Sequence, residues 1–255
     1  MNRTGLAIVL AVAVLVGGLF GVFPRLDVGF SALFFESARQ KFILDHKGWV
    51  DVVRAAARVT IGLLVAPAVI ALIGKVILPR RSMLIGGRAA LFLTVTLALG
   101  PGILANTVLK DHWGRYRPSD VTAFGGPDPF MPWWDPRGQC VDNCSFVAGE
   151  PSGAFWTVAP AALTPPQWRP AAYGAAVAFG AAIGLLRIAG GGHFFTDVVF
   201  AGVLMFLVVW TTHGLLYRWR STRITDKAVE RAFERIGKAI RDGFARIARH
   251  DDAST

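Results

Sequence analysis

The sequence predicts an all-α membrane protein with six transmembrane helices, and three features of the chain support this prediction. First, 53% of its 255 residues are apolar and 17% are charged, whereas about a quarter of the residues are charged in an ordinary soluble protein. Second, the apolar residues gather in long runs, as membrane-crossing helices require. Third, the net charge of +10 comes largely from the loops and the C-terminal tail. This composition also excludes a disordered chain.

The first predicted span covers residues 5–23, which include no charged residue. A helix of this length crosses about 30 Å of hydrocarbon. A cleavable signal peptide is the alternative, because Arg3 would supply its short basic start. The apolar run is long, however, and no clear small-residue cleavage site follows it, so we expect the helix to be retained.

Five further apolar runs predict the remaining spans. They cover residues 59–78, 89–109, 151–163, 171–186 and 198–217. The run at 151–163 is the weakest of these, because it is short and contains Pro160. In an alternative interpretation, this span starts nearer Ser145.

The basic residues predict how these spans are oriented, since lysine and arginine accumulate in short cytoplasmic loops. Arg80, Arg81 and Arg88 join spans two and three, Arg169 joins spans four and five, and the tail after Tyr217 is strongly basic. Both termini are therefore expected in the cytoplasm. The outer side then receives residues 24–58, 110–150 and 187–197.

Two segments outside the spans have the pattern of helices that lie on a membrane surface. Residues 24–58 mix aromatic and aliphatic side chains with charges, which predicts short interfacial helices or a packed cap. In the tail, apolar residues recur at steps of three and four between basic residues, which predicts an amphipathic helix on the cytoplasmic leaflet. These residues are Val229, Phe233, Ile236, Ile240, Phe244 and Ile247. We therefore divide the chain into a transmembrane domain, 1–217, and a basic tail, 218–255.

The two cysteines of the chain, Cys140 and Cys144, are too few for a zinc or iron–sulfur site built from cysteines. In an oxidising compartment they would form a disulfide that closes a very small loop. Two free thiols are an equally good interpretation of the sequence alone.

Ionisable residues gather where the predicted spans end on the outer side. They are Lys110, Arg117, Glu150, Arg187, His193 and Asp197. The predicted topology allows all six to share one pocket. Such residues are functional candidates, because removing a charge from water costs several kcal/mol unless it is paired.

His193 and Asp197 lie four residues apart, which places them on one face of a helix that starts this early. An aspartate bonded to one imidazole nitrogen fixes the tautomer and leaves the other nitrogen as nucleophile or base. Lys110, Arg117 and Arg187 add the cations needed to hold a phosphoryl group. Each residue alone has a purely structural explanation, but together they favour a site. No metal site is expected, because no further cluster has suitable ligand spacing.

The spacing of these residues resembles two motifs of a known family, the type 2 phosphatidic acid phosphatase superfamily. The first motif is K-x6-R-P and the third is R-x5-H-x3-D. The residues that match them are Lys110, Arg117, Pro118, Arg187, His193 and Asp197. By motif, the resemblance covers roughly residues 110–197.

The middle motif of that superfamily, Ser-Phe-Pro-Ser-Gly-His, corresponds to residues 145–150. Gly149 is kept here, and Glu150 stands where the family has its histidine. A second register over residues 151–153 places Ala154 at the histidine and loses the Ser-Phe start, so we prefer the first.

The resemblance implies a lipid phosphatase that needs no metal and no cofactor. Carried over to this chain, His193 attacks phosphorus and forms a phosphohistidine, and Asp197 orients and activates it. The phosphate-binding groups are then Lys110, Arg117, Arg187 and the backbone N–H groups around Gly149.

Glu150 takes the place of the expected general acid. It can donate a proton at neutral pH only if apolar surroundings raise its pKa, and nearby cations would lower it. We expect Glu150 to be the acid or the residue that orients the leaving oxygen.

The aromatic outer loop and the altered middle motif resemble bacterial lipid A phosphatases most, with no preference between the 1- and 4′-phosphate. Undecaprenyl diphosphate, phosphatidylglycerophosphate and phosphatidic acid are alternative substrates. A transporter subunit and a catalytically impaired lipid-phosphate-binding protein are alternatives from other classes. We expect a site facing the periplasm, a phosphorylated lipid and the bilayer as partners, and no nucleic acid. The sequence leaves the oligomeric state open.

Overall fold

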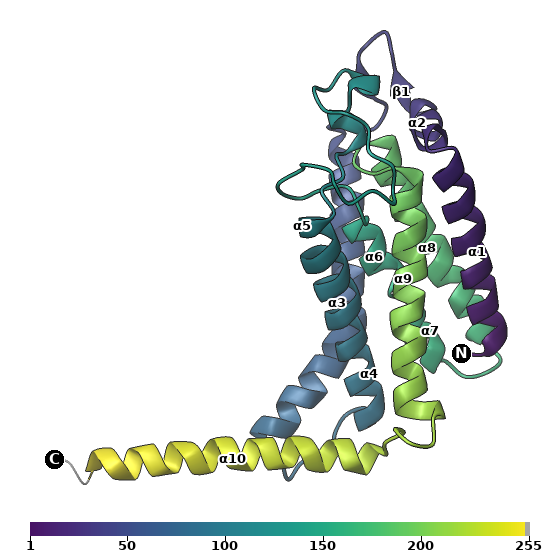
Figure 1. Cartoon of the computed structure of the whole chain (residues 1–255). Coiled ribbons are helices and arrows are strands. Elements are labelled where there is room, and N and C mark those ends of the chain that lie inside the picture. Colours follow the sequence, from purple (N-terminus) through teal and green to yellow (C-terminus); the bar gives the residue numbers. More distant parts are fainter. Residues whose placement is uncertain (253–255) are drawn as a thin grey trace. The chain divides into compact units, whose positions relative to one another are not determined.

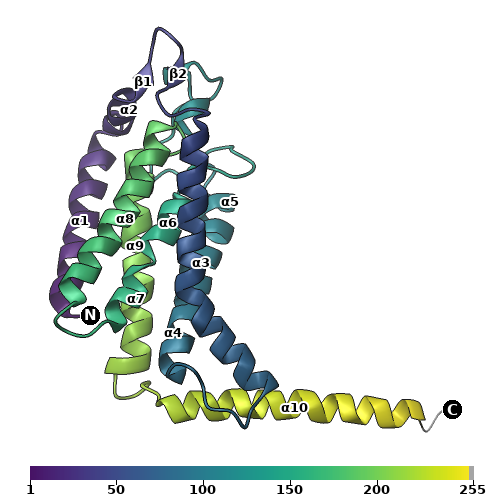
Figure 2. The same cartoon turned by 180° about the vertical axis from the view of Figure 1, so that it is seen from behind.

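The computed structural model describes the backbone of residues 1–252, and their side chains except at positions 244, 245 and 247–252. Helices dominate this part of the chain (Figure 1). The same view from behind shows one short antiparallel strand pair, β1 (Phe35–Glu36) and β2 (Lys41–Phe42) (Figure 2). The predicted all-α fold class is confirmed.

Five helical stretches of the described chain are long and apolar enough to cross a membrane. They are α1 (Arg3–Val22), α3 (Gly48–Ile77), α4 (Gly87–Leu97) continued by η1 (Ala98–Leu109) and α5 (Lys110–His112), α8 (Arg169–Ala189), and α9 (Phe195–His213) continued by η4 (Gly214–Arg218). These stretches correspond to five of the six predicted spans.

The remaining predicted span, 151–163, forms two short helices, α6 (Gly149–Phe155) and α7 (Val158–Leu163). Most of their residues are buried, and both helices pack against α8. Their apolar side chains therefore serve internal packing, whereas only 11% of the apolar window of α1 is buried. The count of six spans stays a prediction.

The chain divides into two compact units, and the first comprises Met1–Ile61 and Thr96–Thr211. Within it, α6 lies beside α8 and α9 in both views (Figures 1 and 2). Gly180 of α8 faces the ring of Phe155, and a Cβ at Gly180 would collide with that ring. Trp156 is fully buried and donates a hydrogen bond to Thr96 Oγ1 at 2.9 Å. These contacts hold the C-terminal end of α6 in place, and the predicted middle motif lies at the other end of this short helix.

Residues 24–58 of this unit fit the packed cap, one of the two forms predicted for them. They contain one helix, α2 (Arg25–Ala32), followed by the strand pair, and α3 begins at Gly48 rather than near residue 59. Phe35, Phe42 and Phe124 form an aromatic cluster with ring centroids 5.1–5.2 Å apart. Some of the apolar residues of segment 24–58, such as Phe42, pack against residues of the long loop between α5 and α6. That loop includes the short turns η2 (Pro118–Asp120) and η3 (Thr122–Phe124).

The second unit comprises Gly62–Val95 and Thr212–Thr255 and includes the helix predicted for the tail, α10 (Asp226–Asp252). Val229 of this helix is buried, whereas Ile236 and Ile240 are 48% and 47% exposed. Of the six apolar residues in the predicted pattern, the side chains of Phe244 and Ile247 lie outside the described residues.

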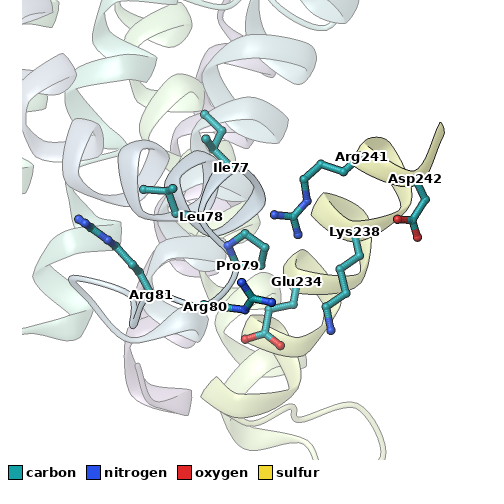
Figure 3. A pocket seen from close by; sticks show the side chains of 9 residues that line it. All are labelled: Ile77, Leu78, Pro79, Arg80, Arg81, Glu234, Lys238, Arg241 and Asp242. Carbon is teal, nitrogen blue, oxygen red and sulfur yellow. The ribbon is translucent and has the colours of Figure 1, made fainter. Parts of the chain in front are cut away.

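A cavity of about 830 Å³ opens between α10 and the end of α3 within this second unit (Figure 3). Ile77, Leu78 and Pro79 form its apolar wall. Its charged residues are Arg80, Arg81, Glu234, Lys238, Arg241 and Asp242. The excess of cations suits an anionic lipid surface, and the location of the tail on the cytoplasmic leaflet stays a prediction.

Candidate active site

The glycine-rich turn between α8 and α9 brings two of the predicted residues to one place. Gly191 has a φ of 71°, a conformation that glycine adopts without strain, and a Cβ there would collide with the ring of Phe42. Gly192 lies directly against the guanidinium of Arg187 and leaves no room for a side chain. The turn places Arg187, near the end of α8, and His193, just before α9, at the same end of these helices, and the glycines let it pack closely against Arg187 and Phe42.

His193 is almost fully buried, at 2% exposure, and its Nδ1 lies 2.7 Å from the backbone carbonyl of Ser145. A carbonyl only accepts hydrogen bonds, so Nδ1 carries the proton and Nε2 carries the lone pair. Burial lowers the pKa of His193 well below its usual value, and the charges of Arg187, Arg117 and Lys110 lower it further. The imidazole is therefore neutral, as a nucleophile must be.

Asp197 does not make the direct hydrogen bond to His193 that the spacing predicts. Its Oδ2 lies 3.9 Å from Nδ1 of His193. Asp197 instead accepts hydrogen bonds from the hydroxyl of Ser145 and, at 2.8 Å, from the backbone N–H of Phe194. The contact between the two residues thus runs through Ser145, whose hydroxyl donates to Asp197 and whose carbonyl accepts the Nδ1 proton of His193.

Arg115 and Asp27 complete this buried network, and neither was predicted from the sequence. Arg115 is fully buried and pairs with Asp197 on one side and, at 2.8 Å, with Asp27 on the other. Its Nη1 also donates to Thr196 Oγ1 at 2.9 Å, and its Nε donates to the carbonyl of Met131 at 3.0 Å. Asp27 also accepts the backbone N–H of Thr196 at 3.0 Å.

Weak signals for both residues are present in the sequence. Arg115 stands two positions before Arg117 inside the first motif, and Asp27 is a carboxylate in the aromatic-rich segment 24–58. Neither signal identifies the partner, because 88 residues separate Asp27 from Arg115. Local spacing does not reveal such a pairing.

Lys110 and Gly149 lie close to each other, as the topology predicts. Lys110 is the first residue of α5, and Gly149 is the first residue of α6. A Cβ on Gly149 would lie 3.7 Å from Nζ of Lys110 and would collide with the amide oxygen of Asn106. Glycine at this position therefore keeps the N-terminal backbone of α6 open beside a cation.

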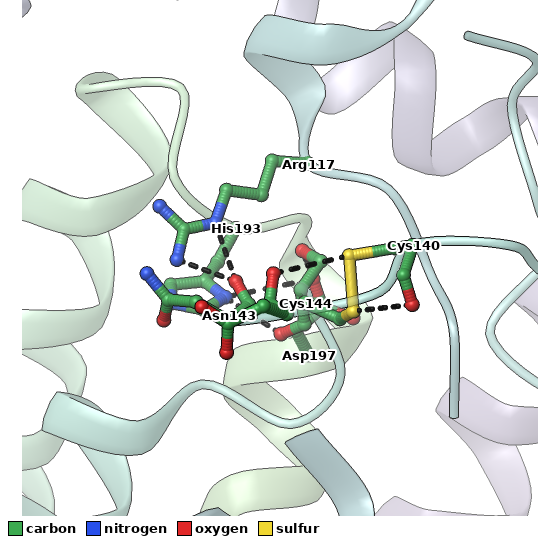
Figure 4. Close-up of a disulfide and its surroundings, with 8 residues drawn as sticks. Arg117, Cys140, Asn143, Cys144, His193 and Asp197 are labelled. Atoms are coloured by element: carbon green, nitrogen blue, oxygen red, sulfur yellow. Dashed lines mark hydrogen bonds and ion pairs between the residues drawn. A yellow bond between two sulfur atoms is a disulfide. The ribbon is translucent and has the colours of Figure 1, made fainter. Parts of the chain in front are cut away.

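Arg117 extends from the other side of the site, where a disulfide shapes the backbone (Figure 4). Its Nε and Nη2 donate to the carbonyl of Asn143 at 3.0 and 2.6 Å. Cys140 and Cys144 are joined by a disulfide, with a Cα–Cα distance of 5.8 Å. Of the two interpretations left open by the sequence, the structure has the disulfide, and it closes the loop that leads directly into Ser145.

Glu150 is held by cations. Its two oxygens accept hydrogen bonds from Nε and Nη2 of Arg54 at 2.8 and 3.0 Å, and Oε1 also accepts from Arg58 at 2.8 Å. Burial alone would raise the pKa of Glu150, but the hydrogen bond from Arg54 and the charges of Arg187, Arg54 and Arg58 lower it overall. This direction is opposite to the raised pKa that a proton donor needs. The predicted role in orienting the leaving oxygen stays a prediction.

Two cavities open among these residues. One of about 260 Å³ is lined by Lys110, Gly149 and Glu150, and one of about 240 Å³ by Arg117 and Arg187. Nε of Arg187 is buried without a hydrogen-bond partner among the described residues; Oε2 of Glu150 lies 3.6 Å away. A donor in this state is suited to receive an anion.

Among the residues that the structure describes, no three His, Cys, Asp or Glu side chains converge as ligands of a metal ion would. The donor set consists instead of cationic side chains and backbone N–H groups around a neutral imidazole. This arrangement can hold a phosphoryl group and offer it a nitrogen nucleophile.

Comparison with known proteins decides the family. Residues 89–224, more than half of the chain, match the PAP2 superfamily. The chain belongs to the PAP2 superfamily. It is accordingly a phosphoric ester hydrolase, and its apolar helices make it a membrane lipid phosphatase.

Three relatives of this PAP2 protein are named Lipid A 4'-phosphatase. That of Francisella tularensis subsp. novicida (strain U112) is 36% identical over 200 residues, which are 78% of this chain and 90% of the relative. That of Rhizobium leguminosarum is 40% identical over 114 residues, 45% of this chain and 48% of the relative. That of Rhizobium etli is 38% identical over 113 residues, 44% of each chain. No solved structure matches this PAP2 protein.

Proposed function

We propose that the protein removes the 4′-phosphate of lipid A in the bacterial inner membrane. The name shared by the three relatives supports this substrate, and one of them matches over most of both chains. The observation that carries the chemistry is the neutral, buried His193, whose proton is held on Nδ1 by the carbonyl of Ser145.

The first step transfers the phosphoryl group to the protein. Nε2 of His193 attacks phosphorus, the ester P–O bond breaks, and the lipid leaves as an alkoxide that takes a proton from water. The Nδ1–H bond to Ser145 stabilises the positive charge that develops on the imidazole. Solvent is the proton source in this scheme because the lowered pKa keeps Glu150 ionised.

The second step returns the enzyme to its starting state. Water attacks the phosphohistidine, the P–N bond breaks, and inorganic phosphate leaves while His193 recovers its lone pair. Lys110, Arg117 and Arg187 neutralise the phosphoryl oxygens in both steps. The backbone N–H groups at Gly149 add donors at the N-terminus of α6.

We place this site on the periplasmic side, with both chain termini in the cytoplasm. The basic loops and tail support this orientation, because lysine and arginine stay on the cytoplasmic side. The disulfide between Cys140 and Cys144 supports it independently, because disulfides persist in the periplasm and are rare in the cytosol.

Phosphate release from lipid A by the full chain in detergent, with EDTA present, tests the proposal. We expect release by the wild type and by Arg39→Ala, whose side chain is exposed and lines neither cavity of the site, and none by His193→Ala. Mass spectrometry of the product identifies which phosphate was removed. An alkaline quench with labelled substrate should trap label on the wild type and none on His193→Ala.

The result separates the remaining alternatives. Release from undecaprenyl diphosphate or phosphatidic acid, with none from lipid A, would keep the chemistry and replace the substrate. A wild type that binds these lipids and releases phosphate from none would contradict the proposed reaction and favour a lipid-binding role.

A further inference from the structure

Two arginines of α3 surround the residue that replaces the middle-motif histidine. Arg54 forms two parallel hydrogen bonds with the carboxylate of Glu150, at 2.8 and 3.0 Å, and Arg58 adds a third at 2.8 Å. The two-bond geometry fixes the plane of the Arg54 guanidinium as well as its position. Arg54 and Glu150 are partly buried, at 27% and 25% side-chain exposure, whereas Arg58 is 59% exposed.

Arg54 is the residue that the two cavities of the site share. It lines the cavity that includes Lys110 and Gly149, and it also lines the cavity that includes Arg117 and Arg187. The cations predicted from the motifs are thus divided between the two cavities, and Arg54 lies where both can be reached. No motif of the sequence indicates this residue.

Arg54 retains donors for a ligand after its contacts within the protein are counted. Its Nε and one Nη2 proton bond Glu150, and one Nη1 proton bonds Asp51 at 2.8 Å. A guanidinium has five N–H groups, so one proton on each Nη atom remains.

We propose that Arg54 is a further phosphate-binding residue of this site and that Glu150 is its positioning residue. The proposal rests on the phosphatase function proposed above. It explains the glutamate in the middle motif, because its carboxylate holds the guanidinium of Arg54 in place. The phosphoryl group then contacts four cationic side chains instead of the three predicted from the motifs.

The cavity beside Arg54 also defines the substrate class. Besides the charged residues, its lining includes apolar residues, which are Ala57, Ile61, Leu97, Pro101 and Ile183. A phosphate ester with an apolar body fits these surroundings, because the phosphate meets the cations while the apolar part contacts the apolar residues.

Binding of inorganic phosphate to the full chain in detergent tests the role of Arg54. Calorimetry and competitive inhibition of turnover should both show binding weakened roughly tenfold to a hundredfold in Arg54→Ala, the usual effect of losing a charged hydrogen bond. Arg54→Lys keeps the positive charge but loses the planar guanidinium with its paired N–H donors. Its affinity for phosphate should lie between that of Arg54→Ala and that of the wild type. Arg39→Ala, on an exposed hairpin position, is the matched control and should bind as the wild type does.

Glu150 requires a readout that separates positioning from proton donation. If Glu150 positions Arg54, Glu150→Gln should raise KM and weaken phosphate binding. The basic limb of the pH profile of kcat should then stay at the same pH as in the wild type. The positioning role also predicts that Arg54→Ala combined with Glu150→Ala is no worse than Arg54→Ala alone. Loss of the basic limb in Glu150→Gln would make Glu150 the acid and overturn this assignment.

The two proposals fail in different ways. If the wild type releases phosphate and folded Arg54→Ala and Arg54→Lys bind phosphate as tightly as the wild type, the role of Arg54 is refuted while the phosphatase function stands. A different result would be a wild type that binds phosphate but releases none from any lipid, together with an Arg54→Ala variant that no longer binds phosphate. In that case the function fails while the anion site stands. Melting temperatures of both variants establish that they are folded.

Discussion

His193 links the pH dependence of stability to the chemistry of the site. Its folded-state pKa lies well below the usual value because burial disfavours the imidazolium. Below about pH 6.5 the unfolded chain therefore binds a proton on this imidazole, whereas the folded protein does not. The free energy of unfolding then falls as pH falls, by about 1.4 kcal/mol per pH unit. Above about pH 6.5 this contribution is absent.

We therefore expect the melting temperature of the wild type to fall more steeply between pH 7 and pH 5 than that of His193→Gln, which has no imidazole to protonate. Thermal unfolding in detergent at several pH values measures this difference. His46→Gln is the control, because His46 is 90% exposed and the substitution therefore removes no buried imidazole. Equal slopes for wild type and His193→Gln would show that the native imidazole accepts the proton after all.

Asp27 is the residue of the network whose loss should affect stability most directly. Asp27→Ala leaves Arg115 buried without one of its two carboxylates. Removing one partner of a buried ion pair costs about 3–5 kcal/mol, so we expect the melting temperature to fall by roughly 10 °C. Asp142→Ala, at an exposed position of the loop between α5 and α6, should change it little. A melting temperature within a degree of the wild type would show that Arg115 is satisfied without Asp27.

At the level of elements, the close contact between α8 and α9 depends on Gly184. A Cβ at this position would collide with a methyl group of Val198, whereas a Cβ at Gly174 of the same helix would meet nothing within 4 Å. Gly184→Ala should therefore destabilise the protein by about 1–3 kcal/mol. Gly174→Ala should stabilise it by about 0.5–1 kcal/mol, because alanine is the better helix former. Thermal unfolding of the two variants measures the contrast, and equal shifts would contradict this account of the packing.

The long apolar helices could be predicted because hydropathy is a local property of the chain. The short helices α6 and α7 could not be distinguished from a span in the same way, since a buried segment and a lipid-facing segment are equally apolar. Residues 24–58 illustrate the same limit: Phe42 has the pattern of a membrane-surface residue, yet it packs against Phe124.

The candidate site was predictable where its residues follow motif spacing, and less so where pairing is long-range. The spacing of His193 and Asp197 placed both residues in the site, but Arg115 draws the carboxylate into the network with Asp27. Ser145 then supplies the contact to the imidazole through its backbone. Hydrogen bonds to backbone carbonyls and ion pairs between distant segments produce no periodic pattern in a sequence. These partners could therefore be identified only from the structure.

For the whole molecule, the distribution of charge and the disulfide support one orientation in the membrane. Basic residues gather in the loop between α3 and α4 and in the tail, where anionic lipid headgroups attract them. The disulfide lies in the long loop between α5 and α6, next to the site. An inverted protein would place that disulfide in a reducing cytosol and the basic tail in the periplasm.

Labelling with a membrane-impermeant maleimide tests this orientation directly. Ala38 lies in the turn between β1 and β2, Ser82 between α3 and α4, and Ser221 before α10, and all three are exposed. With the native cysteines held in their disulfide, a single cysteine at each position reports its own side of the membrane. Ala38→Cys should react in intact spheroplasts, whereas Ser82→Cys and Ser221→Cys should react only after lysis. The reverse pattern would place the site in the cytoplasm, where the lipid substrate would have to be presented from the inner leaflet.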